Sequence, residues 1–288
     1  MNFREATIEL IPYADDRFPP LLREIPNPPR ALYLLGAFAD FSQPHVAIVG
    51  TRRATPQGLA FAQSLAQRLT ELGAVVVSGL ALGLDAAAHK GALMGKGQTL
   101  AVLGNGLDTI YPRHNTALAQ RILEQRGGIL SEYPPSTPAH AHHFLARNRI
   151  VSGLCVATVI IEAPLYSGSL VTARCAAEQG REVFVIPGSI HHPNYQGSHA
   201  LLRDGAQLVA SIEDILSDLN LTSLASLPPH LTDPREQEIF AALQSASAPL
   251  SIDKLVHATT LEPHILTATL TFMITRGIIQ ETPRGYTL

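Results

Sequence analysis

Residues 78–89, Ser-Gly-Leu-Ala-Leu-Gly-Leu-Asp-Ala-Ala-Ala-His, combine glycines with side chains that could do chemistry. They follow the apolar run 74–77 and lead into an alanine-rich stretch, which predicts a strand, a glycine turn and a helix. Gly79 and Gly83 would let the backbone approach a ligand, and the start of the helix would offer unpaired N–H groups and the positive end of its dipole. This arrangement suits a phosphate, although glycine is also common at strand-to-helix turns that bind nothing.

Asp85 and His89 could take part in catalysis or metal binding. They stand four residues apart and would share one face of the predicted helix, as an acid/base pair or as two metal ligands. The alternative is an aspartate bonded near the start of the helix and a histidine packed against the sheet. We favour this structural interpretation.

Other reactive side chains lack the neighbours that catalysis or metal binding needs. His140, His142 and His143 have no Cys or Glu constellation beside them, which favours solvated histidines over metal ligands. Ser167 and Ser169 lie outside any Gly-x-Ser-x-Gly nucleophile elbow. The chain also lacks Gly-x-Gly-x-x-Gly after its first central strand, and the Gly-Lys-Ser or Gly-Lys-Thr of a P-loop. We therefore expect no catalytic residue, no metal site and no cofactor.

Composition predicts a well-packed globular protein. The 288 residues are 46% hydrophobic and 16% charged, with a net charge of −3. Nucleic-acid binding would therefore depend on the local placement of Arg and Lys. No apolar run reaches the roughly 20 residues that span a bilayer, and the N-terminus lacks the basic and apolar regions of a signal peptide. We expect a cytoplasmic protein without membrane insertion.

From residue 46, apolar runs of strand length alternate with helical stretches. This pattern predicts an α/β fold with a parallel sheet that helices cover on both faces. The candidate strands are 46–49, 74–77, 99–103, 128–130, 157–161, 183–186 and 207–209. The candidate helices are centred near residues 64, 89, 119, 149, 174 and 201, and a last helix covers 212–219.

Three further regions accompany this domain, which we place at 45–219. Residues 1–44 predict a short helix, an irregular wrap and one strand, packed on the edge of the domain. Residues 220–232 have the composition of a linker. Residues 233–288 predict a small winged helix of three helices and two strands, at 234–243, 251–258, 263–276, around 277–280 and at 285–288.

Glycine and hydroxyl turns with arginines follow several of the predicted strands. The carboxyl ends of parallel strands share one rim, where ligands bind in such sheets, so we expect an anion site there. Phe144, Arg147 and Arg149 enter the helix that precedes the fifth strand, and at such an entry both arginines could reach the rim. Arginines beside an exposed aromatic ring suit single-stranded nucleic acid. A core phenylalanine with two surface arginines is the alternative.

Four ordered motifs resemble the DNA-processing protein A (DprA/Smf) family. They are residues 78–89, Phe-Leu-Ala-Arg-Asn-Arg-Ile at 144–150, Ser-Gly-Ser-Leu-Val-Thr-Ala at 167–173, and the region from Pro187-Gly188 to Ala206. The resemblance covers about residues 10–215. It implies an extended Rossmann-like fold, in agreement with the predicted parallel central sheet, and the predicted small C-terminal winged-helix domain follows it in the chain.

The resemblance also implies a function without catalytic turnover. Family members bind single-stranded DNA as homodimers in natural transformation, protect incoming strands, help load a RecA-type recombinase and relieve the barrier set by single-strand-binding protein. By motif position, the expected DNA groove is lined by Arg52, Gly79, Leu80, Ala81, Phe144, Arg147, Asn148, Ser167, Gly168 and Ser169. Backbone N–H groups and arginines would hold phosphates, and bases would splay outward with little sequence readout.

Two other functions compete with this one. A nucleoside-phosphate hydrolase on a related Rossmann-like scaffold would need a Pro-Gly-Gly-x-Gly-Thr stretch, where this chain has Ser-Gly-Ser-Leu-Val-Thr at 167–172. A structural adaptor would leave the rim arginines unused. The predicted winged helix adds little for duplex DNA, because residues 232–288 hold four basic and six acidic residues.

Overall fold

The structure, a computed structural model, describes residue 3 and residues 6–221, 233–246, 249–275, 278–282 and 285–287. The chain separates into two compact units, residues 1–222 and 223–288. From residue 222 onward, the linker predicted at 220–232 lies outside the described residues. Its limits and those of the flanking domains stay a proposal.

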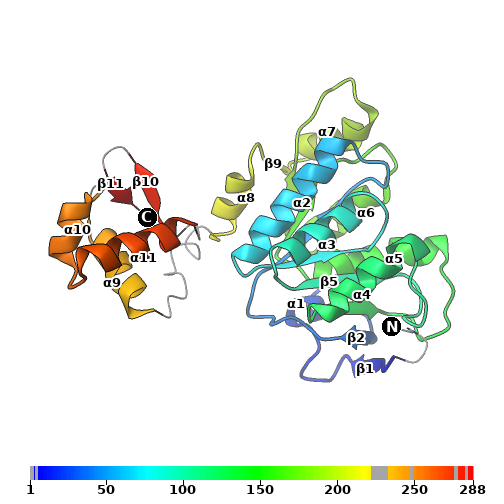
Figure 1. Ribbon diagram of the computed structural model, residues 1–288. Helices are drawn as coiled ribbons and strands as arrows, with labels where there is room; N and C mark the ends of the chain where they lie inside the picture. The colour runs from blue at the N-terminus through cyan, green and yellow to red at the C-terminus, as the bar shows by residue number, and fades with distance from the viewer. Residues whose placement is uncertain are drawn as a thin grey trace. The chain divides into compact units, whose positions relative to one another are not determined.

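A nine-stranded sheet forms the centre of the larger unit in its described residues (Figure 1). The strand order is β1-β2-β6-β5-β4-β3-β7-β8-β9, and the seven strands from β6 to β9 in that order are parallel. These seven are β3 (His45–Val49), β4 (Val75–Ser78), β5 (Thr99–Leu103), β6 (Gly128–Ser131), β7 (Ala157–Ile160), β8 (Glu182–Val185) and β9 (Gln207–Leu208). Each agrees with a predicted strand to within one residue at either end. The predicted α/β fold with a parallel central sheet is confirmed.

Helices cover both faces of this sheet, which is why its central strands are continuous apolar runs. On one face, α5 (Ala141–Gly153) and α6 (Gly168–Glu178) pack against inward residues such as Val49 and Val102. On the other face, α2 (Pro56–Glu71) and α3 (Leu84–Met94) pack against residues such as Val46 and Val76. Further helical segments are α1 (Pro20–Arg23), α4 (Thr116–Glu124), α7 (Gln196–Arg203), α8 (Ile212–Asp218), η1 (Arg113–Asn115) and η2 (Pro193–Tyr195).

The strand order reverses next to β3. The chain builds β3, β4, β5 and β6 outward in one direction, and β7, β8 and β9 then follow on the other side of β3. Helix α5 makes the long connection from β6 back to β7. In open parallel sheets, the crevice at the carboxyl ends of the strands on either side of such a reversal is where ligands bind.

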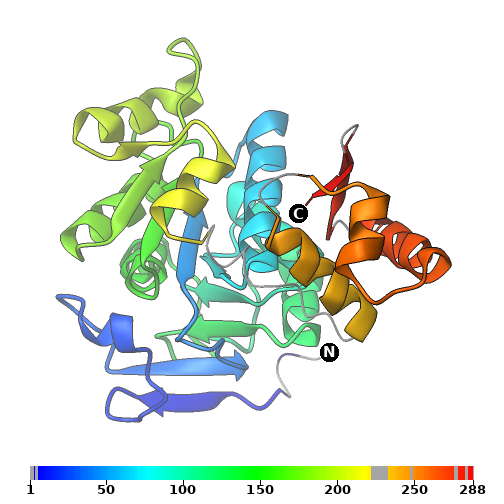
Figure 2. The same cartoon turned by 90° about the vertical axis from the view of Figure 1, so that its left-hand side faces the viewer.

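The first 44 residues contribute two strands to the sheet, whereas the sequence predicted one. β1 (Glu9–Pro12) pairs antiparallel with β2 (Ala31–Gly36), and β2 pairs antiparallel with β6. In Figure 2 these dark blue strands form the lower edge of the sheet. The sequence missed β1 because only Ile11 of its four residues is buried, so the strand has no apolar run to reveal it.

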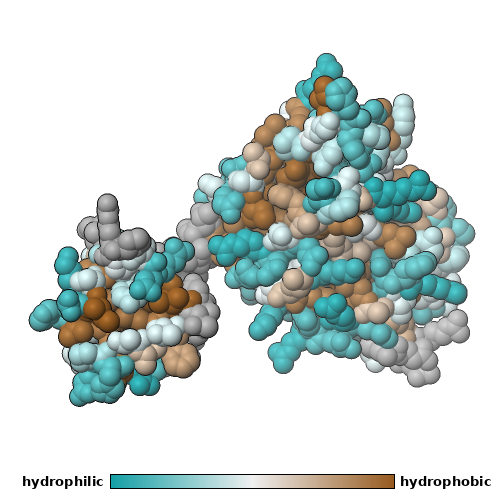
Figure 3. All heavy atoms as spheres, turned by 45° about the horizontal axis from the view of Figure 1, so that its top comes forward, coloured by the Kyte–Doolittle hydropathy of each residue, from teal (hydrophilic) through white to brown (hydrophobic). Residues whose placement is uncertain are grey.

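The smaller unit has its own core. Its elements are α9 (Pro234–Gln244), α10 (Ile252–Ala258), α11 (Pro263–Thr275), β10 (Gln280–Thr282) and β11 (Gly285–Thr287), with β10 antiparallel to β11. The predicted ends at Arg276, Gly277 and Leu288 lie outside the described residues. Apolar side chains reach the surface of this unit (Figure 3), and Phe272 of α11 is 68% exposed. The winged-helix assignment stays a prediction.

A search for helices that could cross a membrane finds none of sufficient length and apolar character in the described ranges.

His89 of α3 is packed inside the larger unit as a neutral side chain. Its Nδ1 lies 2.8 Å from the hydroxyl oxygen of Thr99, and that hydroxyl donates to the carbonyl of Val76 at 2.6 Å. Because the threonine proton is already used, Nδ1 of His89 is the donor. Its Nε2 is buried without a partner in the described residues. Burial, assisted by the charge of Arg147, lowers the pKa of His89 to about 3.

This histidine is expected to make folding pH-dependent. The unfolded chain binds a proton at His89 below about pH 6.5 and the native state only near its lower pKa, so stability is complete above pH 6.5 and falls as the pH drops. Between pH 7 and 5 we expect the unfolding free energy to lose about 2 kcal/mol through this residue. Denaturant unfolding at the two pH values should show this loss in the native chain and in His114→Gln, an exposed control. Equal pH dependence in His89→Gln would contradict it.

Candidate functional site

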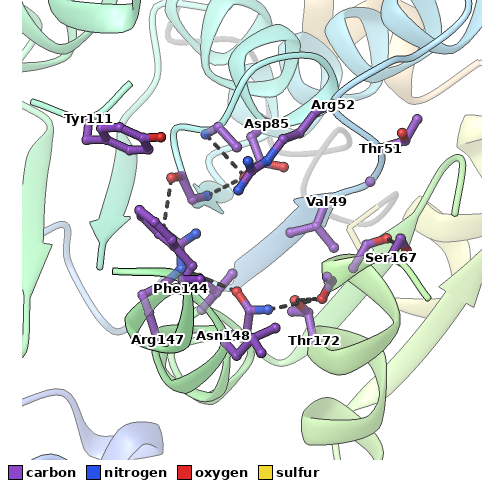
Figure 4. A pocket seen from close by; sticks show the side chains of 18 of the residues that line it. Val49, Thr51, Arg52, Asp85, Tyr111, Phe144, Arg147, Asn148, Ser167 and Thr172 are labelled. Atoms are coloured by element: carbon purple, nitrogen blue, oxygen red, sulfur yellow. Dashed lines mark hydrogen bonds between the residues drawn. The ribbon is translucent and has the colours of Figure 1, made fainter. Parts of the chain in front are cut away.

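A pocket of about 640 Å³ opens where the carboxyl ends of β3, β4 and β7 meet α5 and α6 (Figure 4). Its position is the crevice beside the reversal of strand order. Of the ten residues predicted to line a groove, nine line this pocket: Arg52, Gly79, Ala81, Phe144, Arg147, Asn148, Ser167, Gly168 and Ser169. These residues come from four separate segments of the chain, and the fold brings them together.

Leu80, the middle residue of the predicted Gly79-Leu80-Ala81 turn, is not among the residues that line this pocket, and its contact with DNA stays a prediction. Its side chain is fully buried and belongs to a core cluster that includes residues of α3 and α4. Its backbone has a φ of 55°, a left-handed conformation, at the turn between β4 and α3. The sequence pattern gave this turn's position correctly, but the direction of one side chain depends on a backbone angle that the pattern does not determine.

The glycine turn bonds to its own helix. The amides of Gly79 and Ala81 donate to Oδ2 of Asp85 at 3.0 and 3.4 Å, so these two N–H groups are not free to hold a phosphate as the sequence predicted. Burial raises the pKa of Asp85, against the opposing charge of Arg147 and these hydrogen bonds. The structural interpretation of Asp85 and His89 therefore agrees with their contacts.

Arg147 is buried beneath this turn. Its Nη1 donates to the carbonyl oxygens of Gly79, at 2.9 Å, and Val102, and its Nε donates to Oδ1 of Asn148 at 3.3 Å. A Cβ at position 79 would lie 2.5 Å from Nη2 of Arg147, so only glycine fits there. Burial lowers the pKa of Arg147 to about 10, with the charge of Arg52 acting in the same direction and Asp85 opposing it. The guanidinium remains charged at neutral pH.

Arg52 is exposed and forms no ion pair or hydrogen bond with the described chain. Its guanidinium carbon lies 6.0 Å from the ring centroid of Phe144, at the outer limit of a cation–π contact. The ring of Tyr111 stacks on Phe144, with 5.3 Å between centroids and 27° between planes. The result is a cation beside a pair of aromatic rings.

Sequence reasoning missed Tyr111, which lines the pocket and is 42% exposed. It lies between β5 and η1, in the loop that begins with the glycines at 104 and 106. The signal that could have identified Tyr111 is its place in a loop that follows a parallel strand, because binding residues are common in such loops. Thr51, Arg53, Asp85 and Thr172 also line the pocket without having been predicted as part of the groove.

Ser167 and Ser169 lie at the start of α6, beside the other wall of the pocket. Their hydroxyl oxygens are 2.7 Å apart, and the side-chain amide of Asn148 donates to the carbonyl of Gly168 at 3.0 Å. Asn148 therefore links α5 to the beginning of α6. Within the described chain, neither serine has a histidine or carboxylate among its hydrogen-bond partners.

Arg149 does not reach the rim, contrary to the prediction that both arginines could. It pairs with Glu132 at 2.6 Å and donates from Nε to the carbonyl of Asn27 at 3.0 Å. The helix already begins at Ala141, so Arg147 and Arg149 are separated by two positions within α5 and face different ways.

The histidines before the phenylalanine gather near the start of α5. The ring centroids of His142 and His143 are 4.3 Å apart, and His140 lies 5.2 and 5.6 Å from His143 and His142. In the parts of the chain that the structure describes, no group of three His, Cys, Asp or Glu side chains is arranged to hold a metal ion.

This geometry can bind an anion next to a flat apolar ligand. Arg52 and the charged guanidinium beneath the turn supply positive charge, and the start of α6 adds the positive end of a helix dipole. The rings of Phe144 and Tyr111 offer surface on which a base could stack.

A comparison with known proteins finds its family match within the residues of the larger unit. A family model described as DNA recombination-mediator protein A matches residues 9–220. Protein Smf of Escherichia coli K12 is 45% identical over 210 residues, which cover 73% of this chain and 56% of that protein. DNA processing protein DprA of Streptococcus pneumoniae is 44% identical over 204 residues, covering 71% of this chain and 72% of that protein. The chain thus spans little more than half the length of the E. coli relative.

Two solved structures share the architecture of the larger unit. The X-ray structure of DprA from S. pneumoniae aligns with a TM-score of 0.67 at 40% identity, over 75% of each chain. DNA processing protein A from Helicobacter pylori, whose structure is described for its single-stranded DNA binding mode, aligns with a TM-score of 0.68 at 35% identity, over 75% of this chain and 97% of that one. On the match over residues 9–220 and these similarities, the chain belongs to the DNA recombination-mediator protein A family.

Proposed function

We propose that this protein binds single-stranded DNA in the pocket at the carboxyl ends of β3, β4 and β7. The observation that carries the proposal is the exposed Arg52 beside the stacked rings of Phe144 and Tyr111, over a buried Arg147. Single-stranded DNA needs positive charge for its backbone and flat surfaces for its bases, and a base that stacks on a ring must be free of its complementary strand. The single-stranded DNA binding attributed to the H. pylori relative supports the same ligand here.

The residues divide into three roles in this proposal. Arg52, Ser167, Gly168 and Ser169 hold phosphates, together with the N-terminal amides of α6. Phe144 stacks a base. Gly79, Ala81, Arg147 and Asn148 shape the pocket, because their polar groups mainly bond to one another and to Asp85 and Gly168.

At the level of the cell, we propose a recombination mediator of natural transformation. It protects incoming single strands, helps load a RecA-type recombinase and overcomes single-strand-binding protein, as a cytoplasmic homodimer. Membership of the DNA recombination-mediator protein A family supports this role.

The proposal includes no catalytic turnover. A nucleoside-phosphate hydrolase would need an activated nucleophile or an acid/base pair in the pocket. Asp85 accepts two backbone hydrogen bonds, His89 bonds to Thr99, and the serines bond to each other. These contacts support a binding protein over the hydrolase.

Substitution of the exposed Arg52 tests whether single-stranded DNA is the ligand of the pocket. Fluorescence anisotropy of labelled oligo-dT and of its duplex, across a salt series, should show tighter binding of the single strand. Arg52→Ala should weaken that binding about tenfold, because a contact to a charged group contributes on the order of 1.5 kcal/mol. It should also reduce the salt slope by about 0.7, the value for one phosphate contact. Arg121→Ala, an exposed arginine of α4, is the control. Absence of single-strand binding at low salt would refute the proposal, and equal binding by Arg52→Ala would favour an adaptor.

The base platform is tested at Phe144. Phe144→Ala should reduce affinity for oligo-dT by about 1–3 kcal/mol, the range for one stacked base, with little change in the salt slope. Phe144→Tyr keeps the ring and should bind like the native protein in the same titration. Comparable losses in both variants would mean that the ring does not stack on DNA.

Arg147 is expected to act differently from Arg52. Removing it leaves the carbonyl oxygens of Gly79 and Val102 without a donor and takes a positive charge away from the buried Asp85, so Arg147→Ala should destabilise the larger unit by about 3 kcal/mol. Arg52→Ala should leave stability unchanged within about 0.5 kcal/mol, as is usual at an exposed site. Denaturant unfolding followed by circular dichroism measures both. Equal stability of the two variants would show that the buried contacts of Arg147 are not required.

A further inference from the structure

Glu162 is a buried carboxylate that the proposed DNA contacts do not use. It follows β7 and is fully buried. No ion pair joins it to a basic residue in the described ranges. An isolated buried charge is costly unless hydrogen bonds satisfy it, so its partners indicate what it does.

Every partner of this carboxylate is a donor. The backbone amide of Thr55 lies 3.1 and 3.3 Å from its two oxygens, and the hydroxyl of Thr55 also donates to it. The side-chain amide of Asn194 donates at 2.6 Å and the hydroxyl of Tyr195 at 3.4 Å. An ionised carboxylate only accepts hydrogen bonds, so it suits this set better than any neutral side chain.

The location of Glu162 adds to this fit. Thr55 is the N-cap of α2, and its hydroxyl accepts from the amide of Gly58 while it donates to Glu162. The carboxylate therefore lies at the positive end of a 16-residue helix. A Cβ at position 58 would lie 2.1 Å from the carboxylate oxygen, so this close approach requires glycine.

Glu162 is linked by hydrogen bonds to the residues on both sides of Arg52, directly to Thr51 and through Asn194 to Arg53. The amide of Thr51 donates to the backbone carbonyl of Glu162 at 2.8 Å. On the other side, the side-chain amide of Asn194 donates both to the Glu162 carboxylate and to the carbonyl oxygen of Arg53. Its distance from the Arg53 oxygen is 2.9 Å. The backbone around Arg52 is thus fixed before and after it, while its side chain stays exposed without a protein hydrogen bond in the described chain.

We infer that Glu162 is a positioning residue for DNA binding, which fixes the 51–55 segment so that Arg52 points into the pocket before the strand arrives. The inference rests on the proposed function. A fixed segment has less conformational freedom to lose on binding, so it raises affinity without touching the ligand.

Whether substitution of Glu162 strengthens or weakens DNA binding distinguishes a positioning role from a purely electrostatic one. Removing a negative charge near the pocket would by itself strengthen the binding of a polyanion. Loss of positioning weakens it. Glu162→Gln keeps the shape of the side chain but places an NH2 group where only acceptors fit.

The test is oligo-dT anisotropy with Glu162→Gln and with Glu213→Gln, which removes the same charge from an exposed site on α8. We expect Glu162→Gln to bind about threefold to tenfold more weakly than the native protein, and Glu213→Gln to bind equally or slightly more tightly. In an Arg52→Ala background, Glu162→Gln should have no further effect, whereas general destabilisation would weaken both backgrounds alike. Equal or tighter binding by Glu162→Gln, or an equal loss in both backgrounds, would overturn the inference.

Asn194→Ala provides a second variant, because it removes one donor at a half-buried position and keeps the carboxylate. It should weaken binding in the same direction and should likewise have no effect once Arg52 is absent. If Glu162→Gln fails to fold, this variant decides the inference. A native protein that does not bind oligo-dT would instead refute the proposed function, and one that binds but is insensitive to both variants would refute only the positioning role.

Discussion

Burial of the Arg147 guanidinium is the constraint on which the pocket depends. A charged group inside a protein must find hydrogen-bond acceptors, and this one finds them on the carbonyl oxygens of Gly79, just after β4, and of Val102, near the end of β5. Helix α5 is thereby fixed against the carboxyl edge of the sheet, which brings Phe144 and Asn148 to the pocket. The same contact excludes any side chain at position 79. The Gly-Leu-Ala turn and the arginine motif are thus two halves of one packed unit.

Arg147 and Arg52, both predicted to line the groove, have different surroundings in the structure. Arg147 faces inward, and most of its donors serve the protein, whereas Arg52 is exposed and its donors serve no residue of the described chain. Asp85 offsets the charge of Arg147, and no carboxylate pairs with Arg52 in the described ranges. The positive charge available to a ligand therefore comes mainly from Arg52 and from the start of α6.

The sequence predicted the elements whose residues are buried. It missed features that depend on the direction in which a side chain points. The five parallel strands from β3 to β7 were predictable because each is buried along its whole length and buried strands are continuous apolar runs, whereas β1 has one buried residue and gives no such signal. The glycine and arginine motifs marked which segments meet at the rim. The buried side chain of Leu80, the pairing of Arg149 with Glu132 away from the pocket and the position of the Tyr111 ring depend on backbone angles and helix phase, which spacing alone does not give.

A chain with a net charge of −3 can still present a site for a polyanion if its acidic groups near that site face inward. Asp85 and Glu162 are the relevant cases, since both are buried within or beside the pocket wall and both accept hydrogen bonds from backbone amides at the start of a helix or its preceding turn. Those amides and helix dipoles act to stabilise the two carboxylates, although burial still raises the pKa of Asp85. The two carboxylates therefore order the loops that carry the exposed cation, and they do so with little repulsion toward a phosphate. Local arrangement, and not overall charge, decides what this surface attracts.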